Sequence, residues 1–293
     1  MQLGGDLLFG RRIAERANAP LLCYAYGFKK GMEHARVFTA YQGMAESIDA
    51  KLTAPVQVIG DLVKDSLSFE AGRDTIVSER SGPPHVLFLP GSRPAIRKLS
   101  FKWFVRVAGH MKTLIPDVRF TTLFPPFVPE NEFPVWENAG LAPVKSGGGA
   151  VTAAIMKTSD YALTQPGTNT LEMMHCGLPA LVTVPFDFLD VAPIGGLVKL
   201  VSGVPLMGPA LKKWKMQQSL ERNGGFVSWP NRIAGRAILD EAIGKLTPHD
   251  LAKRVAESLK DEEKLSRVRG ELLELSGESG AASSLCDAVE QVR

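Results

Sequence analysis

The stretch Ser159–Pro179, SDYALTQPGTNTLEMMHCGLP, decides the fold of this chain. Residues 161–163 form an apolar run typical of a buried strand, and the Gln-Pro-Gly of 165–167 is typical of a tight turn. Residues 168–176 then have helical character, which ends at Gly177. A helix that begins directly after a strand presents backbone N–H groups and the positive end of its dipole to a ligand. We expect this ligand to be an anion, in the first place a phosphate.

Side chains of the same stretch offer further contacts. Thr168 and Thr170 carry hydroxyl donors for a phosphate, and Glu172 lies about one turn further along, where its carboxylate can accept from sugar hydroxyls. An alternative stays open, in which Thr168 or Asn169 is the N-cap of the helix. Asn169 and Glu172, three residues apart, then form a capping box.

The same device occurs earlier in the chain. Residues 85–89 (His-Val-Leu-Phe-Leu) have a second buried-strand pattern, which is followed by Pro-Gly-Ser-Arg at 90–93 and by apolar residues at helical spacing. Arg93 is a rigid, permanently charged donor that suits a pyrophosphate and could stabilise charge on a leaving group. Its alternative is the one usual for a lone arginine, a solvated side chain.

A third segment, residues 228–236 (Ser-Trp-Pro-Asn-Arg-Ile-Ala-Gly-Arg), predicts the start of a helix that runs to about Lys245. Asn231 and Arg236 are candidates to reach the same ligand from this segment. As an alternative, Asn231 only caps the helix that follows it.

These three segments stand in the order and at the separations of three motifs of lipid-A-disaccharide synthase. The motifs are Leu-Pro-Gly-Ser-Arg at 89–93, Ser-Asp at 159–160 leading to Gly-Thr-Asn-Thr-Leu-Glu at 167–172, and Pro-Asn-x-x-Ala-Gly-Arg at 230–236. Over most of residues 84–293 the chain therefore resembles the C-terminal half of that family. The resemblance implies an α/β, B-type glycosyltransferase fold with two Rossmann-like domains, and UDP-linked N-acylated glucosamine as the donor.

The resemblance also implies a substrate site. B-type transferases hold the nucleobase, here uracil, at the position of the Lys-Ser-Gly-Gly-Gly turn at 145–149, where glycines let a flat base approach the backbone; a flexible turn explains the glycines alone better. The predicted substrate-binding residues are Gly91, Ser92, Arg93, Gly148, Gly149, Gln165, Gly167, Thr168, Asn169, Thr170, Glu172, Asn231 and Arg236.

A catalytic aspartate of the family lies in an Asp-x-Pro-Asp segment, for which the chain offers only the partial match Gly4-Gly5-Asp6. By this resemblance Asp6 is the predicted catalytic base, which would deprotonate an acceptor hydroxyl. The alternative is that Asp6 is the N-cap of a helix beginning at Leu7.

The chain divides into three predicted parts. Residues 1–70 read as a partial N-terminal α/β domain on the acceptor side, with strands near 1–3, 20–24 and 56–59 and helices near 7–16 and 42–49. Residues 71–84 are the predicted linker. Residues 85–293 are the predicted nucleotide-sugar-binding domain, whose last helix crosses back to the first domain or packs on the second. Because the family has an additional Gly-rich βα region, we expect the chain to start inside its first domain.

Composition excludes several classes of function. A hydrophobic share of 45% and a net charge of +3 are typical of a globular protein and fall short of a nucleic-acid-binding one. Three cysteines far apart imply no disulfide framework and favour a reducing, cytoplasmic compartment. The chain has no Asp-x-Asp motif and no zinc-ligand spacing, so we expect no metal and no other cofactor.

The sequence allows two readings of membrane contact. No apolar run reaches the roughly 20 residues that a membrane-spanning helix needs. A basic segment with Trp214, at residues 212–222, is either a solvated helix face or a peripheral contact with the inner face of the membrane.

We therefore expect a hexosyltransferase of lipid A biosynthesis, which transfers a glucosaminyl unit from a UDP-sugar to a lipid-linked or sugar acceptor. Two alternatives are an enzyme like UDP-GlcNAc 2-epimerase, which would convert the donor without an acceptor, and a non-catalytic remnant that binds UDP-sugar. The pattern leaves open the acceptor, the acyl groups of the donor and the oligomeric state.

Overall fold

The computed structural model describes residues 1–3, 7–68, 82–190, 217–218, 220–221 and 224–292. Two compact units divide the chain. Unit 1 comprises Met1–Ser68 and Gly277–Arg293, and unit 2 comprises Phe69–Ser276. The predicted catalytic Asp6, most of the predicted linker and the lysines at 212–215 lie outside the described residues.

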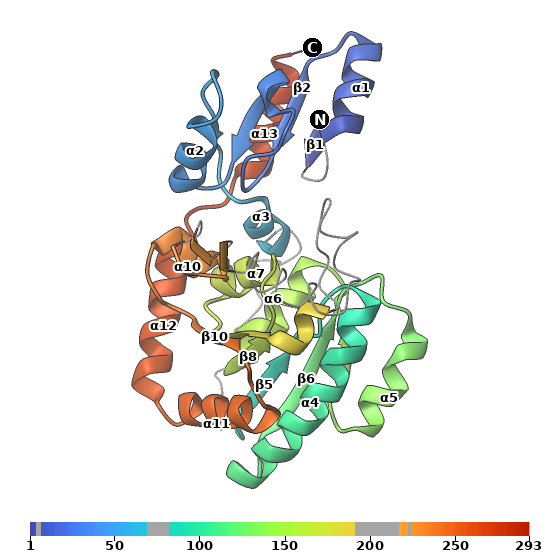
Figure 1. The fold of residues 1–293 in the computed structure, drawn as a ribbon, viewed down its shortest axis with the longest axis vertical. Helices are drawn as coiled ribbons and strands as arrows, with labels where there is room; N and C mark the ends of the chain where they lie inside the picture. Colours follow the sequence, from blue (N-terminus) through green and yellow to red (C-terminus); the bar gives the residue numbers. More distant parts are fainter. Residues whose placement is uncertain (4–6, 69–81, 191–216, 219, 222–223, 293) are drawn as a thin grey trace. The chain divides into compact units, whose positions relative to one another are not determined.

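Unit 1 is a four-stranded parallel sheet with helices (Figure 1), in the strand order β1-β2-β3-β4. Its core gathers around Met32, Val37 and Ile48. The sequence did not predict β3, because the charged Arg36 interrupts its apolar pattern. It did not predict the helix α3 either. The elements are β1 (Gln2–Leu3), α1 (Leu7–Ala17), β2 (Leu21–Tyr24), η1 (Met32–His34), β3 (Ala35–Thr39), α2 (Gln42–Asp49), β4 (Gln57–Val58), α3 (Leu62–Ser68) and α13 (Ala281–Glu290).

The C-terminal helix α13 belongs to unit 1. The Asp65 carboxylate on α3 accepts hydrogen bonds from the backbone N–H of Gly280 at 2.8 Å and of Ala282 at 2.6 Å. These bonds satisfy donors at the start of α13, where a negative charge also favours the helix dipole. Ala281 packs against Gly60, which has no side chain to displace it.

Unit 2 is a doubly wound α/β layer whose six strands are all parallel, in the order β10-β9-β8-β5-β6-β7. This is the Rossmann-type order. Strands β6 and β7 are added on one side of β5, and β8, β9 and β10 on the other, so the strand order reverses between β5 and β8. The elements are β5 (His85–Phe88), α4 (Pro94–Leu114), β6 (Arg119–Phe124), η2 (Glu130–Glu132), α5 (Phe133–Asn138), β7 (Pro143–Lys145), α6 (Gly149–Thr158), β8 (Tyr161–Thr164), α7 (Asn169–Cys176), β9 (Ala180–Pro185), η3 (Phe186–Asp190), α10 (Trp229–Ala234), β10 (Asp240–Gly244), α11 (Pro248–Leu259) and α12 (Glu262–Leu275).

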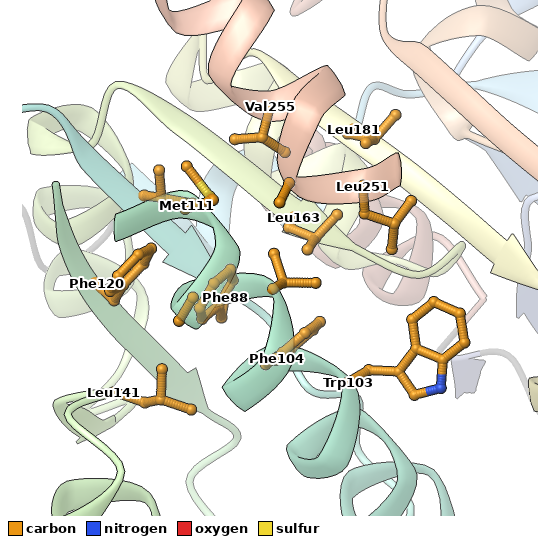
Figure 2. Close-up of a cluster of buried hydrophobic side chains, with 14 of the residues drawn as sticks. Phe88, Trp103, Phe104, Met111, Phe120, Leu141, Leu163, Leu181, Leu251 and Val255 are labelled. Atoms are coloured by element: carbon orange, nitrogen blue, oxygen red, sulfur yellow. The ribbon is translucent and has the colours of Figure 1, made fainter. Parts of the chain in front are cut away.

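The core of unit 2 is aromatic. Helices α4 and α11 pack together, and the buried side chains beneath them come from β5, β6, β8 and β9. Figure 2 shows Phe88 of β5 beside Phe104 of α4 and Phe120 of β6. The ring of Phe88 stacks on both, with centroids 4.6 Å from Phe104 and 5.2 Å from Phe120. This packing holds α4 on the sheet.

One prediction of secondary structure is corrected. The helix that opens at Trp229 does not reach Lys245, because it ends at Gly235 in the left-handed conformation with φ of 65°. Residues 240–244 instead form the edge strand β10, which pairs with β9. The Pro-rich segment 125–134 contains the short helix η2 and the start of α5.

Replacing Phe88 by Ala tests the aromatic core. Phe88 is fully buried, and the lost contacts together with the cavity should lower the free energy of unfolding of unit 2 by about 3 to 5 kcal/mol. Urea denaturation followed by tryptophan fluorescence measures this, since all four tryptophans belong to unit 2. The control Val135→Ala, at a half-exposed position on α5, should cost about 0.5 kcal/mol or less. Equal costs would contradict this core.

Candidate functional site

The candidate site lies at the carboxyl ends of β5 and β8, where the strand order of unit 2 reverses. The turn that follows β5 and the turn that follows β8 line one pocket of about 660 Å³. Open α/β sheets bind ligands at such a switch point, because the helices there diverge to opposite faces. The predicted site residues that line the pocket are Gly91, Ser92, Arg93, Gln165, Gly167, Thr168, Asn169 and Glu172.

The two turns are joined by side chains. The Gln165 amide donates to the Ser100 hydroxyl at 2.7 Å, and this hydroxyl donates to the carbonyl of Pro90 at 3.0 Å. Gly91 has a φ of +86°, and a Cβ there would lie 2.9 Å from Cγ2 of Ile96. Any other residue would be strained by this φ and would push on the Ile96 side chain, so glycine suits this turn.

A buried arginine supports the turn that carries Arg93. Arg97 lies one turn into α4 and donates to both oxygens of Glu132, at 2.9 and 2.6 Å. Its remaining nitrogen donates to the carbonyl of Ser92 at 2.5 Å. These hydrogen bonds hold the pKa of Glu132 below its usual value. Arg97 therefore fixes the backbone of the turn at Ser92. Arg93 is the N-cap residue of α4, and it is exposed where it lines the pocket.

The helix α7 points its N-terminus at the pocket. Thr168 is the N-cap residue, and it makes no side-chain capping bond. The alternative capping box of Asn169 and Glu172 does not form, because Asn169 is the first residue of α7 and not its N-cap. The Asn169 amide nitrogen donates to the Thr164 hydroxyl. The Asn169 carbonyl oxygen is buried and has no partner among the described residues. The start of α7 thus offers polar groups to a bound molecule.

Glu172 lines the pocket one turn into α7. Burial raises the pKa of its carboxyl group to about 7. A carboxyl group in this state either donates or accepts a hydrogen bond near neutral pH. This suits contact with neutral hydroxyl groups better than contact with an anion.

Thr170, Asn231 and Arg236 do not line the pocket. The Thr170 hydroxyl donates to the Gly167 carbonyl at 2.8 Å, within the turn itself. Arg236 pairs with Glu271 at 2.5 Å. The Thr170 hydroxyl is therefore used within the turn and Arg236 in an ion pair at the surface, and neither side chain lines the cavity.

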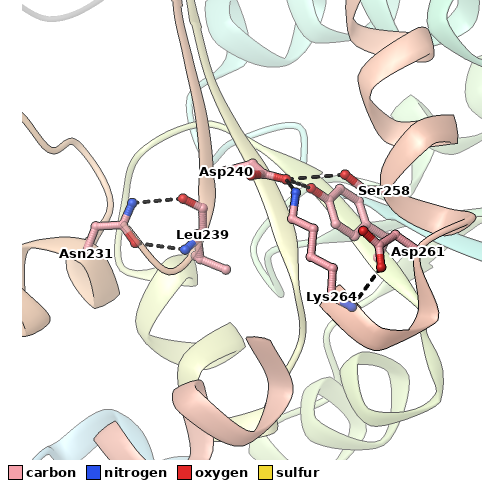
Figure 3. A network of polar contacts seen from close by, with 7 residues as sticks. Asn231, Leu239, Asp240, Ser258, Asp261 and Lys264 are labelled. Carbon is pink, nitrogen blue, oxygen red and sulfur yellow. Dashed lines mark hydrogen bonds and ion pairs between the residues drawn. The ribbon is translucent and has the colours of Figure 1, made fainter. Parts of the chain in front are cut away.

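Asn231 is fully buried, and its amide is fully used. It donates to the Leu239 carbonyl and to Glu241, both at 2.9 Å, and it accepts from the N–H of Ile238 and of Leu239 at 2.8 Å. Figure 3 shows Asn231 beside Leu239, and the neighbouring Asp240 bound by the ammonium group of Lys264. Neither prediction for Asn231 holds: it does not line the pocket, and it does not cap the helix, because Ser228 is the N-cap residue of α10 and Asn231 lies inside that helix.

The segment before α10 contributes to the pocket in another way. The Glu241 carboxylate accepts from the N–H of Val227 at 3.0 Å, and from the N–H and the hydroxyl of Ser228 at 2.9 and 2.6 Å. This carboxylate fixes the segment, and Phe226, Val227 and Arg232 line the pocket. The Arg232 guanidinium lies 4.0 Å from the centre of the Trp229 ring. Arg232 is a second pocket cation, which the sequence reasoning missed although it lies in the third motif.

The predicted base-binding glycines lie beside the pocket and do not line it. Gly148, with a φ of 116°, is the N-cap residue of α6, and Gly149 begins that helix. Their neighbours Ser146 and Thr152 do line it, with their hydroxyl oxygens 2.7 Å apart. Short polar hydroxyls therefore occupy this end of the cavity.

The described residues also bear on metal binding and on membranes. Among the described residues, no cluster of three or more His, Cys, Asp or Glu side chains is arranged to hold a metal ion. None of the helices described here combines the length and the apolar character that crossing a membrane requires.

The class of fold follows from solved structures. WaaG, a glycosyltransferase involved in lipopolysaccharide biosynthesis, matches with a TM-score of 0.50 and 10% identity over 99% of this chain and 74% of its own. MnaA of S. aureus, solved with UDP, matches with a TM-score of 0.56 and 14% identity over 96% and 70%. A putative UDP-N-acetylglucosamine 2-epimerase from Listeria monocytogenes matches with a TM-score of 0.52 and 10% identity, over 96% of this chain and 75% of its own. The fold is the predicted B-type glycosyltransferase fold.

A relative by sequence is a lipid-A-disaccharide synthase. That of Alkalilimnicola ehrlichii is 25% identical over 230 residues, which are 76% of this chain and 54% of the relative. The resemblance that the three motifs indicated is confirmed, and this chain spans about half the length of the curated relative. No protein-family model matches the chain.

Replacing Glu132 by Leu tests the ion pair beneath the Arg93 turn. The change leaves the Arg97 charge buried without its partner, which should lower the free energy of unfolding of unit 2 by about 3 to 5 kcal/mol. The matched control is Glu130→Leu in the same short helix, since Glu130 is exposed and pairs with Lys145 at 3.4 Å. This control should cost at most about 1 kcal/mol. If the Glu132→Leu and Glu130→Leu variants lose the same free energy of unfolding, Arg97 does not support the turn.

Replacing Glu172 by Gln tests the buried carboxyl group. The folded state holds this proton more tightly than the unfolded chain, so the stability linked to it is fully present below about pH 4.5 and is lost as pH rises through about 7. The Gln variant lacks this loss. The free energy of unfolding of the Gln variant, measured from pH 4.5 to 8, should therefore rise relative to that of the unaltered protein as pH increases. Two parallel curves would show that burial does not raise this pKa.

Proposed function

We propose that the pocket of unit 2 binds the nucleoside diphosphate part of a UDP-sugar, and that the protein is a hexosyltransferase. The observation that carries this proposal is the convergence of the α7 N-terminus, Arg93 and Arg232 on one cavity at the switch point. Backbone N–H groups, a helix dipole and two guanidinium groups suit a diphosphate. The UDP in the MnaA structure supports the same ligand class.

The groups of the ligand match groups of the pocket. The diphosphate would lie at the start of α7, where Thr168 adds a hydroxyl donor. The ribose would lie against Glu172, whose carboxyl group suits sugar hydroxyls. The uracil would lie toward Ser146 and Thr152, at the turn that the resemblance assigns to the base. The first two assignments follow from the chemistry of the side chains that line the cavity, and the third rests on the resemblance.

The proposed reaction transfers a glucosaminyl unit to a hydroxyl of a lipid-linked or sugar acceptor, with inversion at the anomeric carbon. The C1–O bond to UDP breaks, and the acceptor oxygen forms the new bond to C1. Negative charge then develops on the leaving diphosphate, where fixed cations and N–H dipoles lower the barrier. The acceptor proton passes to a general base, for which Asp6 is our candidate.

The likeness to lipid-A-disaccharide synthase supports this transfer over its alternatives. An epimerase-like activity is a second candidate, because the Listeria monocytogenes protein has a similar fold. It would change the configuration of the donor sugar without any acceptor. A non-catalytic binder would take up UDP and turn nothing over.

Binding of UDP is the direct test of the pocket. Replacing Arg93 by Gln removes one charged donor from an exposed position and should weaken UDP binding by about tenfold, measured by titration calorimetry. Arg106→Gln, at an exposed position further along the same helix α4, should leave the affinity unchanged. No heat of binding with the unaltered protein would remove the proposal.

Turnover separates the three candidates. A transferase should release UDP from UDP-GlcNAc or an acylated UDP-glucosamine only when an acceptor is present, and Asp6→Asn should lower that rate without changing UDP affinity. Sugar conversion without an acceptor would favour the epimerase. Tight binding of UDP with neither reaction would leave the binder.

A further inference from the structure

An exposed aromatic ring lines the pocket and takes no part in the core. Phe127 follows β6 and is 67% exposed, although it belongs to the lining of the cavity. The next phenylalanine back, Phe124, is fully buried and stacks on Phe133 with centroids 5.0 Å apart. Exposing a phenyl ring to water is unfavourable. A ring held in this way suits a partner that arrives in the cavity.

The backbone around Phe127 is held in place. Pro125 and Pro126 precede it, and their rings restrict the chain. The Val128 N–H donates to the Pro125 carbonyl at 3.1 Å, and the Val128 side chain is fully buried. A turn closed by a hydrogen bond and anchored on both sides presents the Phe127 ring at little cost in conformational entropy.

The position of Phe127 divides the pocket chemically. The strand β6 lies on the β7 side of the switch point, and the Ser146 N–H donates to the Phe124 carbonyl at 2.8 Å. Phe127 and the hydroxyls of Ser146 and Thr152 therefore come from adjoining turns. The α7 N-terminus comes from β8, on the other side of β5. One side offers a flat apolar face with small polar groups, and the other offers anion donors.

We propose that Phe127 is the stacking platform for the nucleobase of the bound nucleoside diphosphate. This rests on the proposed function in so far as the cavity holds a nucleotide. An aromatic face stacks on any base, because every base has a π-face. The rotatable hydroxyls of Ser146 and Thr152 adapt to donors or acceptors on the edge of the base. Phe127 then contributes affinity for the base, while the diphosphate is held without it.

The test separates the base from the diphosphate by calorimetry with UDP, ADP, GDP and inorganic pyrophosphate. Phe127→Ala should lower the affinity for the nucleotide that the unaltered protein prefers by about 5- to 150-fold, and it should leave the affinity for pyrophosphate unchanged. Phe127→Trp should keep the affinity, and its fluorescence should change when the nucleotide binds. The matched control is Phe9→Ala, an equally exposed ring at 68% in unit 1 that does not line the pocket.

The outcomes distinguish this inference from the proposed function. If UDP binds and Phe127→Ala does not weaken it, or weakens pyrophosphate equally, Phe127 is not a base platform, and the UDP site stands. If another nucleotide binds in place of UDP and Phe127→Ala weakens it, the platform stands and the UDP assignment falls. If no nucleotide binds, both fall.

Discussion

The parallel pairing of β5 with β8 is the constraint on which the site depends. Leu87 lies beside Ala162 and Phe88 beside Leu163, and the Leu89 N–H continues the ladder to the Leu163 carbonyl. Because both strands run the same way, the turns that follow them leave the sheet at one edge. Later strands are added on opposite sides of this pair, so the helices diverge and a crevice opens between the turns. Aromatic packing on β5 and the Gln165 hydrogen bond then hold that crevice in shape.

Much of this arrangement could be predicted from local sequence. Apolar runs of strand length followed by Pro-Gly turns mark β5 and β8, and the parallel-sheet rule then predicts that their turns meet. Arg93, Gln165 and Thr168 do share one pocket, as that reasoning requires. The resemblance added the B-type fold, which no single motif defines. Whether these residues bind a substrate, and whether Asp6 is a base, stay predictions.

The rest depends on pairs that are distant in sequence. Arg97 meets Glu132 and Asn231 meets Glu241, and no local pattern marks either carboxylate as a partner. Asn231 was predicted at the ligand because it stands in a motif, but the backbone of residues 238–239 uses its amide fully. The segment Asp240–Gly244 was predicted as helix, since its strand character comes only from pairing with β9.

Unit 1 is assembled from both ends of the described chain, and this bears on biosynthesis. Residues of α13 such as Ala281 and Leu285 are buried in it, yet a ribosome adds them only after the whole of unit 2. About 200 intervening residues, added at about 5 to 20 per second, imply a delay of roughly 10 to 40 seconds. Throughout that interval the nascent sheet lacks the cover of its last helix, and the apolar surface left bare is a natural target for chaperones. Unit 1, whose first residues leave the ribosome before unit 2, is thus the last to complete its fold.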